Sequence, residues 1–203
     1  MHEYSIDARR NKILFYLSLF AIALASTISA LLHNLPFVTI TIPVTSFTFF
    51  LLFVRIFTTK LWRKPSYQRI GITKTPDLNG EWQCVRFNEV TGEQTTCTLR
   101  IKQTWTKIRF EFTQEGYIYV SYATAIQTRY PLGTRVSVAI QIFRVVKQHL
   151  PEKINDAFID FMILSNDELQ GRYYTNPQAF SQYGLLTCTK INNTTNVNEP
   201  SHS

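Results

Sequence analysis

The sequence predicts an N-terminal two-helix transmembrane hairpin followed by an all-β domain, an eight-stranded antiparallel up-and-down β-barrel. Three observations support this prediction. Two apolar segments without any charged residue lie near the start of the 203-residue chain, at residues 13–32 and 37–54. Short runs of β-branched and aromatic residues follow them, separated by turn residues. Within these runs apolar and polar residues alternate, as in strands that bury one face.

Each apolar segment is about long enough to cross a hydrocarbon core roughly 30 Å thick. Only residues 33–36 separate them, so we expect transmembrane helices over residues 13–32 and 37–57. A secretory signal is one alternative for the first segment, but its apolar stretch would span about 7–15 residues. A soluble protein with two buried helices is the other alternative, and two such long uncharged segments in so short a chain disfavour it.

Cations flank the apolar pair on both sides, whereas the loop between the two segments has none. Because cytoplasmic loops are enriched in Lys and Arg, we expect both chain ends on the cytoplasmic side. Residues 1–12 then form a cytoplasmic N-terminus, and residues 58–76 form a juxtamembrane linker. The flanking cations are Arg9, Arg10, Lys12, Arg55, Lys60, Arg63 and Lys64.

The β-barrel domain is expected over residues 77–191, and a disordered polar tail over residues 192–203. A two-sheet sandwich is the second choice of architecture. One interval, His149–Asn155, carries a weak helix pattern. The expected strands are Glu81–Phe87, Thr96–Gln103, Thr106–Thr113, Tyr117–Gln127, Thr134–Val146, Ala157–Leu164, Glu168–Thr175 and Tyr183–Ile191.

The alternation within these strands indicates which side chains face the interior. We expect an apolar inner face in each of four strands. The inward residues are Leu99 and Ile101, then Ile108, Phe110 and Phe112, then Ile118, Val120 and Tyr122, and finally Val136, Val138, Ile140 and Ile142.

The composition favours a binding protein over an enzyme. The formal net charge of +7 suits a surface near anionic lipid or a phosphate-bearing ligand. The three cysteines have no metal-like spacing, and a cytoplasmic domain would keep them reduced. No His pair has the spacing of metal ligands, and no nucleophile or phosphate-loop motif is present. We therefore predict no catalytic residues, no metal and no cofactor.

Residues suited to a nucleotide lie in two turns and one strand. Trp105 lies in the turn after the second strand, and Arg129 and Tyr130 lie in the turn after the fourth, at the same end of an up-and-down barrel. Flat aromatic faces stack on bases, and arginines bind phosphates. Gly171, inside the seventh strand, indicates a bend or a close backbone approach. Packing and solvated surface positions are the alternative roles for these residues.

Three stretches resemble a known family. They read LNGEW at Leu78–Trp82, IKQTWTKI at Ile101–Ile108 and LQGRYYT at Leu169–Thr175, with Gly184–Leu186 following in the last strand. Together with the two apolar segments, they are similar to the bacterial CBASS antiphage effectors. Those effectors join two transmembrane segments to a β-strand-rich sensor of a cyclic nucleotide.

The resemblance implies a membrane-bound effector in the bacterial inner membrane. A cyclic di- or oligonucleotide would bind the cytoplasmic barrel and drive self-association, and the clustered helices would disrupt the lipid bilayer and kill the infected cell. No polymeric nucleic acid is expected as a partner. A lipocalin-like carrier and a protein-docking module are the alternatives. The ligand-binding residues that we expect are Trp105, Thr106, Tyr122, Arg172, Tyr173 and Thr175.

The first apolar segment also carries a row of small residues at a spacing of four. Such rows let transmembrane helices approach closely, so we expect this face to pack against another helix. The row consists of Ala21, Ala25 and Ser29, with Ser18 one step away.

Overall fold

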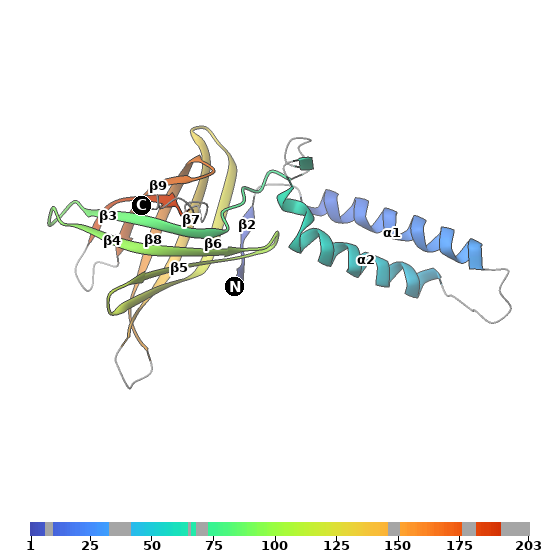
Figure 1. Ribbon diagram of the computed structural model, residues 1–203, viewed down its shortest axis with the longest axis horizontal. Helices are drawn as coiled ribbons and strands as arrows, with labels where there is room; N and C mark the ends of the chain where they lie inside the picture. Colours follow the sequence, from blue (N-terminus) through green and yellow to red (C-terminus); the bar gives the residue numbers. More distant parts are fainter. Residues whose placement is uncertain are drawn as a thin grey trace, which may run out of the picture. The chain divides into compact units, whose positions relative to one another are not determined.

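A computed structural model describes residues 1–6, 10–32, 42–64, 66–67, 73–145, 151–175 and 182–191 of the chain (Figure 1). The expected disordered tail over residues 192–203 lies outside these residues. The chain divides into two compact units. The barrel unit contains Met1–Ile6, Pro76–Gln103 and the chain from Lys107 onwards. The helical unit contains Asp7–Thr75 and Thr104–Thr106.

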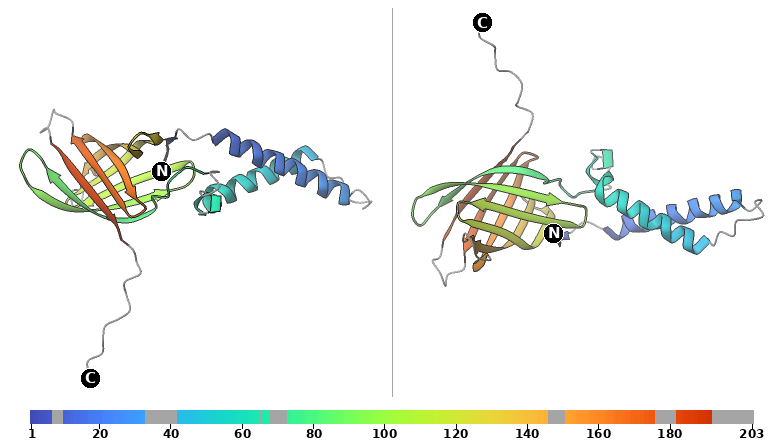
Figure 2. Two further views of the ribbon diagram at one scale, coloured as in Figure 1. Left: turned by 90° about the horizontal axis from the view of Figure 1, so that it is seen from above. Right: turned by 60° about the horizontal axis from the view of Figure 1, so that its bottom comes forward.

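The barrel unit is an eight-stranded antiparallel up-and-down barrel, as the alternation predicted (Figure 2). Each strand pairs with the next along the chain, and the barrel closes where β10 pairs with β3. The strands are β3 (Gly80–Asn88), β4 (Gln94–Gln103), β5 (Lys107–Gln114), β6 (Tyr117–Tyr130), β7 (Gly133–Arg144), β8 (Glu152–Ser165), β9 (Glu168–Thr175) and β10 (Tyr183–Lys190).

The weak helix pattern at His149–Asn155 proved wrong where the structure describes it. Residues 152–155 open strand β8, which begins five residues earlier than expected. Asn155 pairs with Ile142 of β7, and Glu152 pairs with Arg144. The long partner strand provides backbone hydrogen bonds that a marginal helical turn could not match. His149 itself lies outside the described residues.

The barrel interior is filled by apolar side chains from all eight strands. Phe110 and Phe161 stack across it with ring centroids 6.3 Å apart, and both are fully buried, as is Trp82. The inner faces expected for β4, β5 and β7 are confirmed, because Leu99, Ile108 and Val136 and their alternating neighbours are buried.

The inner face of β6 is the opposite of the one expected. Tyr119 pairs with Phe112 and Ser121 pairs with Ile140, so the odd-numbered residues point inwards. Tyr122 therefore lies on the outside, where it is 51% exposed. A register shift between Ser121 and Ala123 then reverses the alternation, so that Thr124 and Ile126 are buried. The expectation for β6 was wrong because the polar-tipped Tyr119 and Ser121 face the interior here, in place of the aliphatic Ile118 and Val120.

Two short strands precede the helices and belong to the barrel. Strand β1 (His2–Glu3) pairs with β5 antiparallel, and β2 (Ser5–Ile6) pairs with β6 in parallel. Tyr4 between them is only 3% exposed and joins the barrel core. Residues 1–12 were expected only as a cytoplasmic N-terminus, yet His2 Nε2 lies 2.9 Å from Ser121 Oγ in the barrel. Two strands of two residues each are too short to be recognised from their sequence.

Cys84 and Cys188 form a disulfide between the neighbouring strands β3 and β10. The expectation of reduced thiols is wrong for this pair, because the strand register places their Cα atoms 4.0 Å apart. Cys97 is the register partner of Cys84 on β4 and keeps its thiol free. The three cysteines therefore form one row across β4, β3 and β10.

The helical unit contains α1 (Arg10–Leu32), α2 (Ile42–Thr59) and the short 3₁₀ helix η1 (Leu61–Arg63). Among the described residues, α1 alone is long and apolar enough to cross a membrane: an 18-residue stretch within Arg10–Leu31 has a mean hydropathy of 2.1. Helix α2 provides a shorter apolar stretch, Thr45–Thr59. Ala21 and Ala25 of the small-residue row are buried, and Phe20 contacts Phe53 with ring centroids 5.2 Å apart. Part of the small-residue face thus packs inside the hairpin.

Gly171 sits where β9 passes closest to β8, as its place inside a strand suggested. A Cβ atom there would lie 2.5 Å from the carbonyl oxygen of Asp160 and 2.9 Å from Phe161 Cδ1. We expect Gly171→Ala to lower the free energy of unfolding by about 1–3 kcal/mol, since the backbone must shift. The control is Gly116→Ala, whose Cβ meets nothing within 4 Å and whose cost comes only from a φ of +73°. Thermal unfolding of the full chain in detergent compares them, and a melting temperature for Gly171→Ala above that of Gly116→Ala would contradict this account.

Candidate ligand-binding site

One end of the barrel is closed by its own chain. We call it the Leu78 end; it carries the β6–β7 and β8–β9 turns and the start of β3. The Gln103 side chain accepts a hydrogen bond from Leu78 N (2.9 Å) and donates one to Pro76 O (3.1 Å). The indole of Trp82 donates to Leu78 O at 3.2 Å, and Leu78 is 2% exposed. These bonds leave no route to the interior through Leu78.

The opposite end, which we call the Arg86 end, holds a small chamber inside the barrel. The chamber has a volume of about 40 Å³. Hydrogen-bonding groups from five strands line it, beside the apolar side chains of Phe112, Ile140, Ala157, Ile159 and Leu186. The residues that carry these groups are Arg86, Cys97, Gln114, Tyr119, Tyr173 and Thr175.

Arg86 is the one charged residue among those that line the chamber. Its guanidinium carbon lies 5.3 Å from the ring centroid of Tyr173, a cation–π distance. Arg86 Nε and the Tyr173 hydroxyl are both buried, and no described residue forms a hydrogen bond with either atom. Buried polar groups are normally paired, so these two atoms are suited to a ligand that supplies acceptors and donors.

Burial keeps the other titratable groups of the chamber neutral at pH 7. It raises the pKa of Tyr119, and the nearby Arg86 lowers that pKa by less. Burial likewise raises the pKa of the Cys97 thiol, against an opposing effect of Arg86. The pKa of Tyr173 is raised for the same reason. The chamber therefore presents one positive charge within neutral walls, an arrangement that favours an anion.

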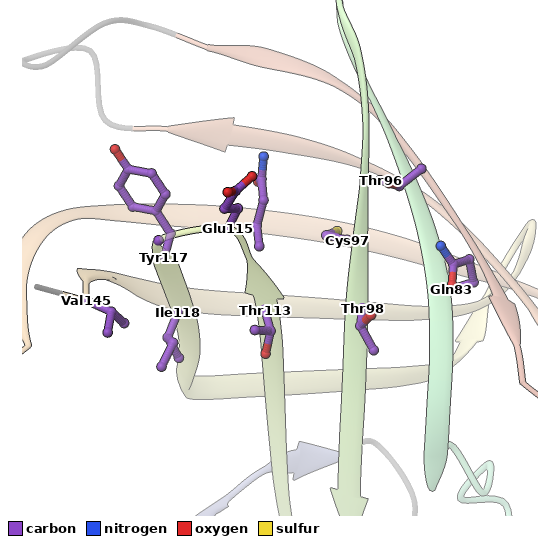
Figure 3. A pocket seen from close by; sticks show the side chains of 11 residues that line it. Gln83, Thr96, Cys97, Thr98, Thr113, Glu115, Tyr117, Ile118 and Val145 are labelled. Atoms are coloured by element: carbon purple, nitrogen blue, oxygen red, sulfur yellow. The ribbon is translucent and has the colours of Figure 1, made fainter. Parts of the chain in front are cut away.

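A lateral cleft in the barrel wall adjoins this chamber, and Figure 3 shows the side chains that line the cleft. The pairing of β4 with β5 ends at Thr98 and Thr113, so β4 separates from the β5–β6 turn beyond that point. The cleft has a volume of about 590 Å³ and is lined by Thr96, Thr98, Thr113, Glu115 and Tyr117, among others. Cys97 and Gln114 border both the cleft and the chamber, so the two are neighbours.

Cleft and chamber together suit a ligand that is larger than the chamber, carries negative charge and has flat rings. The cleft has room for the body of such a ligand, and its threonine and glutamine side chains can hydrogen-bond to it. One anionic group could reach Arg86, while Tyr117, Tyr119 and Tyr173 offer aromatic faces. No described group of three or more His, Cys, Asp or Glu side chains could hold a metal ion.

Two of the six predicted site residues line the chamber. Tyr173 and Thr175 both point inwards on β9. The Thr175 hydroxyl donates to Gln182 O at 3.1 Å and accepts from Gln182 N at 2.9 Å, so it also ties the ends of β9 and β10 together.

The other four predicted residues lie elsewhere. Tyr122 is on the outer face, and so is Arg172, whose register partner Asp160 forms an ion pair with Arg135. Trp105 and Thr106 belong to the helical unit. Their contribution to binding stays a prediction.

Trp105 is held by the helical unit through several contacts. Its ring packs edge-on against Phe57 with centroids 4.9 Å apart, and only 2% of its surface is exposed. The backbone N–H of Trp105 donates to Thr58 O at 3.2 Å near the end of α2. Arg10 donates to Trp105 O at 3.0 Å. The aromatic ring that drew attention in the sequence thus serves packing in this structure.

The sequence reasoning missed Arg86, Gln114 and Tyr119. One signal was available, because Arg86 continues the inward phase of Trp82 and Cys84 along β3. An arginine at an inward-facing position of a strand, where the other inward-facing residues are apolar, often has a functional role. Gln114 likewise continues the inward alternation of Ile108, Phe110 and Phe112 along β5. Nothing comparable pointed to Tyr119, since its inward direction depends on the register between β5 and β6.

The comparison with protein families matches residues 73–190 to the family described as "Cap15, cyclic dinucleotide receptor domain". The matched segment covers β3–β10, the whole eight-stranded barrel, and includes every residue that lines the chamber. The resemblance noted in the sequence is thereby confirmed. Among curated proteins, no significant relative was found.

The pKa of the Cys97 thiol depends on the charge of Arg86 in the chamber. Cys97 can be alkylated selectively, because Cys84 and Cys188 are bonded to each other in a disulfide. Burial raises its pKa and Arg86 opposes that effect, so Arg86→Gln should raise the pKa further. We expect the pH midpoint for alkylation of Cys97 by iodoacetamide to move upwards. The control Arg100→Gln removes an exposed cation of the same strand as Cys97 that is paired with Glu81, and it should leave the midpoint in place. A midpoint that falls or stays unchanged in Arg86→Gln would contradict the geometry described.

Proposed function

Because the chain belongs to the Cap15 cyclic dinucleotide receptor family, we propose that it is a CBASS effector whose barrel binds a cyclic dinucleotide in the cleft and chamber at the Arg86 end. The observation that carries this proposal is the half-buried Arg86 beside Tyr119 and Tyr173, whose Nε is buried without a hydrogen-bond partner. A phosphate of the ligand would accept from the guanidinium, and a charge-assisted bond of this kind is stronger than a neutral one.

The rest of the ligand would lie in the lateral cleft. A cyclic dinucleotide has two phosphates and two bases, and the 40 Å³ chamber is too small for the whole molecule. One base would stack on the tyrosines where the cleft meets the chamber, and the threonines of β4 and β5 would hydrogen-bond to sugars or base edges. Arg144, the register partner of Tyr117 on β7, is exposed at the same end and could bind the second phosphate.

The interior disfavours the lipocalin-like carrier that the sequence left open. Such a carrier needs a roomy apolar cavity, whereas aromatic side chains fill this barrel and the chamber at the Arg86 end has a volume of only about 40 Å³. A protein-docking module would make no use of a cation inside the barrel. A cyclic dinucleotide would give the unpaired Nε of Arg86 a hydrogen-bond acceptor.

We expect Arg86→Gln to weaken binding of a cyclic dinucleotide by about tenfold or more, since a charge-assisted hydrogen bond contributes about 1.5–3 kcal/mol. Isothermal titration of the full chain in detergent measures this, with cyclic di-AMP, cyclic di-GMP and cyclic GMP–AMP as probes. Arg172→Gln is the matched control, because it removes an equal charge from the outer face of β9.

Equal losses in the two variants would mean that the ligand binds outside the chamber. Substitutions of Trp105, Thr106 and Tyr122 in the same assay would test the remaining residues expected from the sequence. Wild-type protein that binds none of the three probes would weaken the receptor proposal itself.

We further propose that both α1 and α2 cross the inner membrane as a hairpin. Residues 1–6 and residues 76–191 belong to the same barrel unit, so they lie on the same side of any bilayer. The chain between them must then cross an even number of times. Helix α1 alone would give an odd number, and α2, whose 18 residues rise about 27 Å, is long enough to provide the return.

The topology can be tested by cysteine labelling in intact cells. A membrane-impermeant maleimide should label Asn34→Cys, between the two helices, from the periplasmic side, while Ser201→Cys in the tail should react only after lysis. The reason is that cations flank the hairpin at its other ends, which places both chain termini in the cytoplasm. External labelling of Ser201→Cys, with Asn34→Cys protected, would exclude the hairpin in this orientation.

Binding is proposed to drive copies together in the membrane, where the clustered helices disrupt the bilayer and kill the infected cell. Helix α1 exposes large apolar side chains, including Phe15, Tyr16 and Leu31, to lipid or to other copies. Ala21 and Ala25 are already used within the hairpin. The exposed apolar face of α1 is therefore the better candidate for contact between copies in the bilayer.

A further inference from the structure

The eight long strands leave a gap in the barrel wall, where β5 and β6 are not paired with each other. We call this gap the seam. Strands β5 and β6 pair directly only between Glu111–Gln114 and Tyr117–Val120. Beyond this stretch, β1 pairs with β5 and β2 pairs with β6, so Met1–Ile6 fills the seam (Figure 1). This segment lies outside the family match over residues 73–190. We call it the N-terminal strand.

The N-terminal strand is held by a small set of contacts. His2 and Glu3 are the register partners of Ile108 and Lys107 on β5, and two more pairs, Ser5–Ala125 and Ile6–Ile126, join it to β6. Tyr4 anchors it in the core, and His2 hydrogen-bonds to Ser121. Each long strand of the barrel has many more register pairs, so this strand is the one most easily released as a unit.

Release of the N-terminal strand would leave two open strand edges. The backbone groups of β5 around Ile108 and of β6 around Ile126 would lose their partners. Open edges accept any strand of matching register, and the β1–β2 segment of another copy matches by identity. The strand would make the same contacts in its own barrel and in the barrel of another copy. The two arrangements therefore differ only in the path of the segment that connects the strand to α1.

We propose that this seam is an interaction surface between copies of the chain, in which the N-terminal strand of one copy enters the barrel of the next. The inference rests on the proposed function for its setting, a receptor confined to a membrane. Tethering in the bilayer raises the effective concentration of neighbouring N-terminal strands, and this favours exchange.

The connection between the N-terminal strand and α1 is short, so exchange of the strand would also bring helices of different copies together. Four Cα steps separate Ile6 from Arg10, the first residue of α1, so they span at most about 14 Å. An acceptor barrel is therefore held within that distance of the donor's helix. When each copy donates to one neighbour and accepts from another, the contact is heterologous and builds open-ended clusters. Exchange thus gathers helices without any separate oligomer interface.

The experiment uses two full-length chains with different tags, co-expressed in one membrane. One carries Ser5→Cys and the other Ala125→Cys, register partners on adjacent strands, which lie about 5 Å apart and can form a disulfide. The collision control replaces Ala125→Cys with Val90→Cys, an exposed position in the β3–β4 turn. A single chain with both Ser5→Cys and Ala125→Cys reports the strand that stays within its own barrel.

With mild oxidation and added cyclic di-AMP, cyclic di-GMP or cyclic GMP–AMP, we expect a two-tag heterodimer roughly tenfold or more above the Val90→Cys control. Internal crosslinking of the double variant should fall in parallel. A heterodimer no more abundant than the control, while the double variant crosslinks internally under every condition, would overturn the exchange. Titration calorimetry on the same proteins separates the two proposals: binding without heterodimer refutes exchange alone, and heterodimer without binding refutes the receptor function alone.

Discussion

The requirement that every strand edge be paired governs this structure. A barrel removes edges by closing on itself, and here closure is completed by different means around the circumference. Strand β10 pairs with β3 over seven register pairs, and the Cys84–Cys188 disulfide joins the same strands. Between β5 and β6 the first six residues of the chain fill the seam, whereas between β4 and β5 the ladder ends early and leaves the lateral cleft.

The two incomplete ladders have different roles because they lie at opposite ends of the barrel. The cleft adjoins the Arg86 end, where the chamber holds the half-buried Arg86 and neutral tyrosines. The N-terminal strand lies towards the Leu78 end, where apolar side chains fill the core. In the proposed binding mode, a ligand would reach the chamber without disturbing that core. The strand that connects directly to α1 is the one with the fewest pairs.

Much of the fold could be predicted from the sequence, because period-two alternation and turn residues are local signals. Seven of the eight long strands began within three residues of their expected positions, and β9 coincides with its prediction. The site was harder to predict. Arg172 and Tyr173 are adjacent in the sequence, yet one faces solvent and the other the chamber. Which of the two faces the chamber depends on the pairing of β9 with β8. The sequence LQGRYYT does not indicate which of its alternating residues face the interior.

The sequence by itself determined the apolar segments, the strand-rich domain, the family resemblance and the lack of catalytic motifs, since these depend on composition and short-range periodicity. The tertiary structure decided what depends on contacts between distant segments. It brought Arg86 together with Tyr119 and Tyr173 from three strands, and it joined Cys84 to Cys188. It also placed residues 1–6 in a barrel whose other strands begin at residue 80. Six residues are too few to show a periodic pattern. Their role as strands became visible only through their pairing with the edges of β5 and β6.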